Sequence, residues 1–294
     1  MYLADNLIKW LFFTILVVLF GSAFLLIELS LNSFSPIQIA FFRVFFASIF
    51  LLIYALVMGY KFNFIKKNFI LLFILGLSGT TIPFFLISWA QTTISSSETG
   101  ILIGFMPLFT IIGSHYFFKY ENLSFNKILG FILGLCGLFI LLMNNNEEVN
   151  IYGNIYAKAA VIISAFFYAV NALLVKKISN VNLISLSAVV MIFSSIQLLL
   201  MSFTGKEIYY VNEEIFISSI IAISILSLLS TAFATVLYYK IIHDYGPNFL
   251  SLVNYPIPIF AFFVGIIFLN EKFNMLSILS LILVVLSVYI SQKK

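Results

Sequence analysis

Ten long stretches without Asp, Glu or Lys dominate this sequence, and only one of them contains an Arg. The stretches cover residues 10–27, 29–60, 68–97, 99–118, 128–146, 159–175, 178–205, 215–239, 245–270 and 273–292, and Arg43 interrupts the second. An α-helix needs about 20 mostly apolar residues to cross a bilayer. Each stretch is therefore long enough for one span, and we expect an all-α integral membrane protein with ten transmembrane helices.

Composition excludes the main alternatives to this fold class. Of the 294 residues, 63% are hydrophobic and 9% are charged, whereas a soluble domain carries roughly 25% charged residues. Disordered chains combine low hydrophobicity with high net charge, which is the opposite pattern. The apolar runs are continuous rather than alternating, which favours helices over the strands of a membrane barrel. Short connections such as 61–67 and 206–214 leave no room for a soluble catalytic domain.

The lysines indicate how the spans are oriented. With ten spans, both termini and the even-numbered loops share one side, and that side carries eleven lysines. The opposite side carries three, which are Lys158, Lys206 and Lys272. Loops rich in Lys and Arg stay in the cytoplasm. We therefore expect a multi-pass inner (cell) membrane protein of a bacterium, with its N- and C-termini cytoplasmic.

The two halves of the chain resemble each other. In the fourth span Pro107 lies 14 residues before Glu121, and in the ninth Pro258 lies 13 residues before Glu271. These matches suggest repeats over residues 1–146 and 147–294, each with five spans. Because five is odd, the second repeat enters the membrane upside down relative to the first. Inverted repeats around a site at the midplane are typical of secondary transporters that work by alternating access.

Several short motifs resemble the drug/metabolite transporter superfamily, specifically its EamA-type ten-helix permeases. The motifs, in chain order, are Phe20–Phe24, Pro36 with Phe42–Val44, Ser95–Gly100 leading to Glu121, Gly153–Asn154 leading to Tyr168, and Pro258 to Glu271. The resemblance covers essentially the whole chain. The sequence departs from the family pattern at Phe20, where Trp is usual, and at Glu28, where a basic residue is common.

The resemblance implies a secondary transporter that moves small organic solutes, such as metabolites, amino acids or drugs, in either direction. Its expected partners are a small-molecule substrate and the lipid bilayer, with possible proton or solute coupling; we expect no nucleic acid, cofactor or metal. No enzyme motif occurs in the sequence, since it has neither a His/Cys metal cluster nor a Gly-rich phosphate loop with Lys. A non-transporting membrane partner or scaffold is the alternative function, and an intramembrane enzyme is a third.

Arg43 is the most notable polar residue inside the expected membrane region. It lies seven residues beyond Pro36, a residue type favoured at the first helical turn, which puts it about 10 Å below the surface. Ionisable groups at such depth usually face an interior and have a partner. Arg43 either pairs with Glu28, caps backbone carbonyls, extends to the interface, or binds a substrate carboxylate or phosphate.

Other candidates follow from helix depth and chemistry. Together with Arg43, the candidates for a substrate cavity are Ser22, Thr80, Thr81, Trp89, Tyr168, Asn171, Asn254 and Tyr255. The candidates for breaks in the helices are Pro107, Pro256 and Pro258, because proline removes a backbone donor. For the Ser and Thr residues, ordinary helix packing is the competing interpretation.

Two further ionisable residues are candidates for coupling. Glu98 follows a serine run at the start of the fourth span, where a carboxylate stabilises the positive end of a helix. His115 has a side chain that titrates near neutral pH, but it lies near the end of its span beside Tyr116. Each therefore has a structural interpretation, as helix cap or interfacial histidine, and a functional one, as part of a proton or ion relay.

Overall fold

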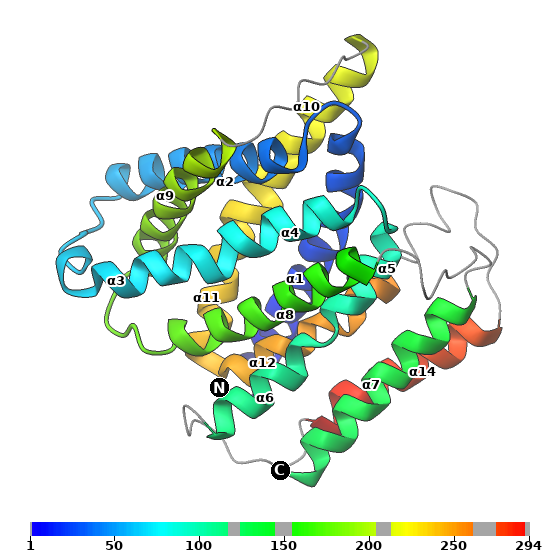
Figure 1. The fold of residues 1–294 in the computed structure, drawn as a ribbon. Helices are drawn as coiled ribbons and strands as arrows, with labels where there is room; N and C mark the ends of the chain where they lie inside the picture. Colours follow the sequence, from blue (N-terminus) through cyan, green and yellow to red (C-terminus); the bar gives the residue numbers. More distant parts are fainter. Residues whose placement is uncertain (1, 117–123, 145–154, 204–212, 261–274, 292–294) are drawn as a thin grey trace.

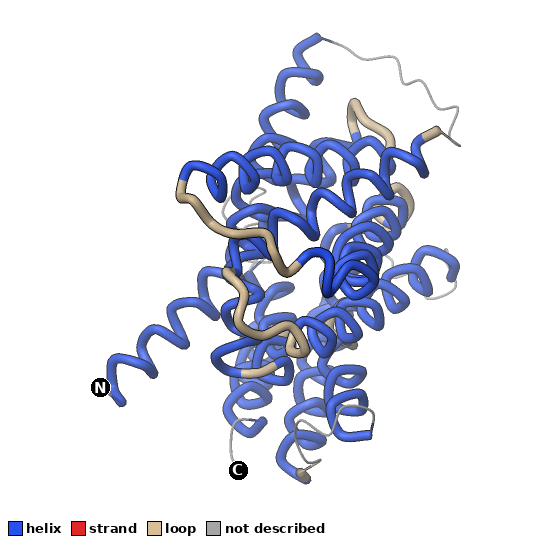
Figure 2. The backbone as a smooth tube through the Cα atoms, turned by 90° about the vertical axis from the view of Figure 1, so that its left-hand side faces the viewer, coloured by secondary structure: helices blue, strands red, loops and turns tan. Residues whose placement is uncertain are grey.

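The computed structural model describes residues 2–116, 124–144, 155–203, 213–260 and 275–291, and every regular element in these ranges is helical (Figures 1 and 2). The elements are α1 (Tyr2–Leu31), α2 (Pro36–Val57), α3 (Ile65–Gly76), η1 (Leu77–Thr81), α4 (Ile82–Ala90), α5 (Ser96–Ile103), α6 (Met106–Tyr116), α7 (Phe125–Asn144), α8 (Ile155–Val175), α9 (Leu183–Ser202), α10 (Glu213–Ser227), η2 (Leu228–Phe233), α11 (Ala234–Tyr245), α12 (Pro247–Ser251), η3 (Leu252–Asn254) and α14 (Met275–Ser291).

The structure confirms the all-α membrane class. Within the described residues, seven helical segments are long and apolar enough to cross a bilayer, and two shorter apolar helices cover Phe125–Gly137 and Ile282–Ser291. Large apolar side chains such as Ile70 and Val57 are three-quarters exposed, as expected where lipid rather than water surrounds a protein. The second half of the predicted ninth span lies outside the described residues, so the count of ten remains a prediction.

Polar residues set where the helices begin. Ser35 starts α2 with a capping box, in which Gln38 bonds back to the Ser35 backbone, and Pro36 occupies the first turn. Asn182 starts α9 by accepting hydrogen bonds from two backbone amides of the first turn. These caps satisfy amides that lack partners within the helix, and they set the depth at which the residues of α2 and α9 lie.

The helices form a bundle in which elements from the two halves of the chain pack together. α2 packs along α9, α4 along α8, and α1 along α10 and α11. α8 presents a row of small buried residues to its neighbours, namely Ala157, Ala160, Ala165, Ala169 and Ala172. Small side chains let helices approach closely in a membrane, where packing rather than water exclusion drives association.

Helices α7 and α14 lie side by side next to this bundle (Figure 1). Their backbones approach closely at Gly130, where an added Cβ would lie 2.7 Å from the carbonyl oxygen of Ser287. A larger residue at position 130 would force the two helices apart. The pair thus packs against one side of the bundle, where α7 contacts α5 and α6.

Two of the long spans contain a π-helical turn that the sequence did not predict. η1 interrupts the third span between α3 and α4, and η2 interrupts the eighth between α10 and α11. A π-turn bonds residue i to i+5 and often occurs at functional sites. In both spans the turn carries adjacent hydroxyl residues, Thr80–Thr81 in η1 and Ser230–Thr231 in η2.

The fourth and ninth spans are each broken within the bundle. The α-helix stops at Ile103, and α6 begins at Met106, one residue before Pro107. In the ninth span, α12 gives way to the 3-10 turn η3, and helix resumes at Pro256 after Tyr255. Both breaks therefore lie beside prolines, where a missing backbone donor weakens the helical ladder.

Candidate functional site

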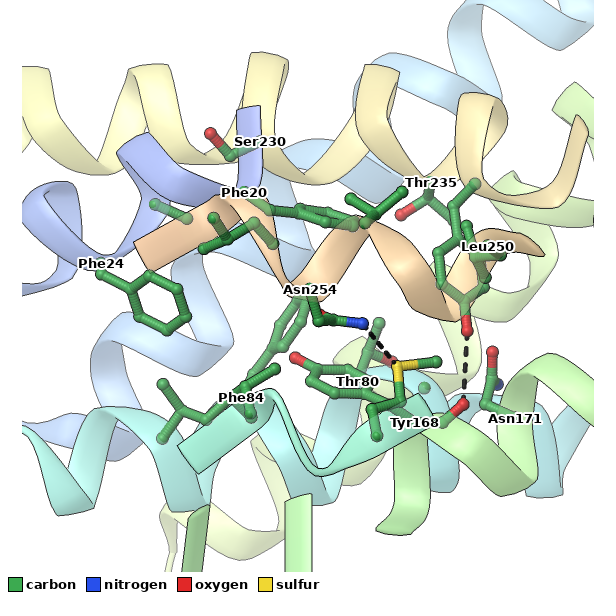
Figure 3. A pocket seen from close by; sticks show the side chains of 18 of the residues that line it. Phe20, Phe24, Thr80, Phe84, Tyr168, Asn171, Ser230, Thr235, Leu250 and Asn254 are labelled. Atoms are coloured by element: carbon green, nitrogen blue, oxygen red, sulfur yellow. Dashed lines mark hydrogen bonds between the residues drawn. The ribbon is translucent and has the colours of Figure 1, made fainter. Parts of the chain in front are cut away.

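A partly open cavity lies among α1, α2, η1, α4, α8, η2, α11 and the two broken spans. Its empty space, including the open side, amounts to about 870 Å³. Figure 3 shows its walls, to which both halves of the chain contribute. Its aromatic lining consists of Phe20, Phe24, Phe84, Tyr168, Tyr238 and Tyr239, and its polar lining of Arg43, Thr80, Asn171, Ser230, Thr235 and Asn254. A mostly apolar cavity with a few polar groups is the usual form of a small-molecule site.

Arg43 is 4% exposed and projects from α2 toward this cavity. Its Nε donates a hydrogen bond of 3.1 Å to Oγ1 of Thr231. The guanidinium carbon lies 3.6 Å from the centre of the Phe84 ring, within the range of a cation–π contact. Among the described residues, the two terminal nitrogens of the guanidinium have no hydrogen-bond partner.

The expected ion pair between Arg43 and Glu28 is not formed, which corrects one interpretation of the sequence. Glu28 is exposed on the outer face of α1, while the preceding residue, Ile27, is 1% exposed and faces the interior. Consecutive residues in an α-helix differ by 100° around the axis. The step from Ile27 to Glu28 therefore turns the carboxylate away from Arg43.

The π-turn η2 orients the partner of Arg43. The Thr231 hydroxyl donates to the backbone oxygen of Leu226, five residues earlier, at 2.8 Å. A hydroxyl has one proton and two acceptor lone pairs. Because its proton is engaged by Leu226, Thr231 presents an acceptor to the guanidinium, and the irregular turn fixes the position of Arg43.

Asn171 joins α8 to the other π-helical span. Its Nδ2 donates to the backbone oxygen of Leu75 at 3.0 Å and to the Ser78 hydroxyl at 3.3 Å. The Asn171 side chain can come this close to η1 only because position 79 is a glycine. A Cβ added at Gly79 would lie 2.8 Å from Cγ of Asn171. Asn171 therefore lines the cavity and also holds α8 against the third span.

Thr80 and Thr81 bind helix α9 rather than a common ligand site. The Thr80 hydroxyl bonds Ser194, and Thr81 donates to Oε1 of Gln197 at 2.6 Å. The amide of Gln197 in turn donates to the backbone oxygen of Phe73 at 3.1 Å. Only Thr80 of the two threonines reaches the cavity wall.

Asn254 connects the two broken spans across the cavity (Figure 3). Its Nδ2 lies 2.9 Å from the Ser251 carbonyl oxygen and 3.0 Å from the sulfur of Met106. Tyr255 is fully buried and points toward α7 instead. Its ring packs against Gly134 so closely that an added Cβ on this glycine would lie 2.8 Å from the ring. Of this adjacent pair, only Asn254 lines the cavity.

The remaining candidates lie away from the cavity wall. Ser22 donates to the Leu19 carbonyl within its own helix at 3.1 Å, and Trp89 is 39% exposed on the surface. Glu98 forms a salt bridge of 3.0 Å with Lys158, which ties α5 to α8. His115 is partly exposed and packs edge-on against Tyr116 at 4.7 Å between ring centres.

The cavity also contains aromatic residues that were not predicted from the sequence. Tyr238 donates a hydrogen bond of 3.4 Å to the backbone oxygen of Tyr168, and its ring meets Phe20 edge-on at 6.4 Å. Phe84 supplies the surface beneath Arg43. With 35 Phe and 15 Tyr in the chain, aromatic identity alone did not distinguish these three from residues that face lipid.

No arrangement typical of metal or acid–base catalysis is present in the described part of the chain. These residues contain no group of three His, Cys, Asp or Glu side chains that could hold a metal ion. The polar groups of the cavity are instead hydroxyls, amides and one guanidinium. Such groups orient and bind a ligand.

Comparison with known proteins gives consistent results. The profile of the EamA-like transporter family matches residues 8–143 and again residues 155–292. An uncharacterised transporter of Archaeoglobus fulgidus is 26% identical over 97% of this chain and 99% of its own length. The S-adenosylmethionine/S-adenosylhomocysteine transporter of Chlamydia trachomatis is 26% identical over 61% of this chain and 57% of its own length. A crystal structure shares the fold, with a TM-score of 0.78 at 14% identity, over 97% of this chain and 96% of its own.

Proposed function

Because the chain belongs to the EamA-like transporter family, whose members include transporters of small solutes, we propose that its central cavity is the substrate site of an alternating-access transporter. The cavity supports this proposal, because one continuous space is lined by helices from both halves of the chain. Movement of one half relative to the other would change access to a site between them. The solute crosses without chemical conversion.

The two halves, residues 1–146 and 147–294, act as inverted repeats in this proposal. The family profile matches once in each half. Each half also has a π-turn in its third helix and a broken fourth helix. Both kinds of irregular backbone lie beside the cavity, where neighbouring groups satisfy the freed carbonyls.

The proposed transporter lies in the inner membrane with both termini in the cytoplasm. This orientation rests on the eleven lysines that the ten-span topology assigns to one side. Under it, the Glu98–Lys158 salt bridge lies toward the outside. Transport is driven by a solute or proton gradient, since no nucleotide-binding loop occurs in the sequence.

Transport into proteoliposomes tests the proposal. The purified protein is reconstituted and offered a broad panel of metabolites, and uptake and counterflow are measured. Ala23 lines the cavity and is 7% exposed, whereas Val18 lies on the same helix and is 40% exposed. We expect Ala23→Trp to abolish transport and Val18→Trp to retain it, because only the first substitution fills the cavity.

Two results would contradict the proposed site or function. Equal transport by wild type and Ala23→Trp would place the solute path elsewhere. If no solute moves or exchanges in wild-type vesicles across the panel, the chain acts as a non-transporting membrane partner instead. Correct folding of each variant is checked by size-exclusion chromatography and thermal unfolding in detergent.

A further inference from the structure

Arg43 places a positive charge in the cavity, and no carboxylate of the described residues forms a salt bridge with it. Among the described residues that line the cavity, it is the only charged side chain. Glu28 is exposed on the far side of α1, and Glu98 is paired with Lys158. Buried charges in proteins are normally paired, so the missing counter-charge points to a ligand.

The contacts that Arg43 does make leave its best donors available. Thr231 accepts from Nε, and Phe84 covers one face of the guanidinium. The two terminal nitrogens remain without partners in the described structure. A guanidinium binds a carboxylate through parallel N–H donors, and such charge-assisted pairs are among the strongest hydrogen bonds in proteins.

Holding helices together does not explain the charge on Arg43. The π-turn η1 is attached to α9 through Thr81 and the neutral amide of Gln197 at 2.6 Å. The π-turn η2 is attached to α2 through Thr231 and Arg43 at 3.1 Å. Since a neutral side chain ties the first turn to its neighbour, a charge is not required to tie the second.

The rest of the cavity restricts the remainder of the ligand. Its walls are largely apolar and include six aromatic side chains, among them Phe20 and Phe24 (Figure 3) and Tyr238. No acidic side chain among the described lining residues could pair with an ammonium group. A cationic group would also be repelled by Arg43 at short range in an apolar environment.

We propose that the cavity selects small organic monocarboxylates with an apolar or aromatic body, which bind through the terminal nitrogens of Arg43. This substrate class rests on the proposed function, because it identifies the cavity as the solute site. Cationic and zwitterionic solutes are disfavoured. The class therefore differs from the sulfonium-bearing substrate named for the chlamydial relative.

Ligands that share a phenyl or aliphatic body and differ in their polar group test this proposal. The probes are 3-phenylpropionate, phenylalanine, phenethylamine and 3-phenylpropanol, together with aliphatic carboxylates and their matched amines and alcohols. Binding is measured by thermal shift on the purified protein, and transport by counterflow in vesicles. We expect carboxylates to bind and exchange, and their matched amines, amino acids and alcohols to bind about tenfold more weakly or worse.

Variants at position 43 assign the preference to the guanidinium. Arg43→Gln copies the neutral side chain found at Gln197, so we expect it to fold and to lose the preference for carboxylates. Arg43→Lys keeps the charge without the two-pronged donor geometry, and an intermediate preference is expected. If Arg43→Gln fails to fold, the charge series on the wild type and Arg43→Lys still decides the question.

The outcomes separate the substrate class from transport itself. If the protein exchanges amines or amino acids better than matched carboxylates, the proposed substrate class is wrong while transport stands. The same conclusion follows if carboxylates show no preference in binding or if Arg43→Gln retains the preference. Absence of any solute movement, with Ala23→Trp and wild type binding every probe equally, would overturn both proposals.

Discussion

The two π-turns of this protein make the same kind of connection with different chemistry. Each turn presents a threonine hydroxyl to a helix from the other half of the chain. On η1, Thr81 meets Gln197 of α9, and the Gln197 amide also reaches the Phe73 carbonyl, so oxygen and nitrogen both have partners. On η2, Thr231 meets Arg43 of α2, and two nitrogens remain without protein partners in the described structure.

Within one fold, the η1 contact is structural, and the η2 contact belongs to the binding site that we propose. In the η1 contact both the oxygen and the nitrogen of the Gln197 amide have protein partners, so the contact is closed to a ligand. In the η2 contact the donors exceed the acceptors, and the surplus faces a cavity. Unmatched hydrogen-bonding capacity beside the cavity therefore distinguishes the two contacts, whereas burial does not, because Arg43 and Gln197 are similarly buried.

The largest effect on transport is expected when the η2 contact is given the neutral side chain found in the η1 contact. Arg43→Gln should lower transport efficiency for a carboxylate substrate by about tenfold to a hundredfold, because a charge-assisted hydrogen bond contributes about 1.5–3 kcal/mol. Counterflow rates measured over a range of substrate concentrations give this ratio. The unfolding temperature without substrate should change little, and a large drop would show that the charge is structural.

Removing the hydroxyls of the two turns should have unequal effects on transport. Thr231→Val keeps the side-chain shape but removes the acceptor for Arg43, and we expect a loss of substrate affinity of about threefold to twentyfold, since hydrogen bonds in membrane bundles average about 0.6 and reach about 1.7 kcal/mol. Thr81→Val is the matched control in the other turn, and it should leave affinity unchanged. Equal losses in the two variants would contradict the distinction between the contacts.

Breaking the closed contact should affect stability rather than transport. Gln197→Leu removes the acceptor of Thr81 and the donor to Phe73, and we expect the free energy of unfolding to fall by about 1 kcal/mol. Unfolding in a denaturing detergent, followed by tryptophan fluorescence, measures the change. Transport per folded molecule should stay within about twofold of wild type, and a larger loss would give Gln197 a role in binding.

The smallest effect is expected at a charged contact outside both turns. Glu98 and Lys158 lie 3.0 Å apart with side chains about one-fifth exposed, and exposed ion pairs contribute about 0.2–1 kcal/mol. A double-mutant cycle with Glu98→Gln and Lys158→Met should give a coupling energy within this range. Substrate affinity should not change, because neither side chain lines the cavity.

The class of fold was predictable from the sequence because it depends on runs of apolar residues. Continuous stretches of about 20 residues indicate helical spans without knowledge of which face is buried. Arg43 was also identifiable, because a charged residue inside such a run is costly and conspicuous. Its supposed partner Glu28 was wrong because a helix that is apolar on all sides gives no signal of which face turns inward.

The details of the cavity depend on features that leave little trace in the sequence. A π-turn arises from one extra residue in a helical turn, and η1 and η2 contain ordinary apolar and hydroxyl residues. Phe84 and Tyr238 belong to the cavity through their orientation, which composition does not reveal. Ser22, Trp89 and Tyr255 have suitable chemistry and depth, yet their helices direct them elsewhere.

The single guanidinium beside Phe84 also has a consequence for how the membrane voltage would act on the proposed transport cycle. With no other charged side chain among its described lining residues, the cavity carries one positive charge when empty and none when it holds a monoanion. A potential of 100 mV contributes about 2.3 kcal/mol for each elementary charge that crosses the whole field. In the proposed cycle the voltage would therefore act mainly on the return of the empty carrier, and uncoupled transport of a monoanion would produce an electric current.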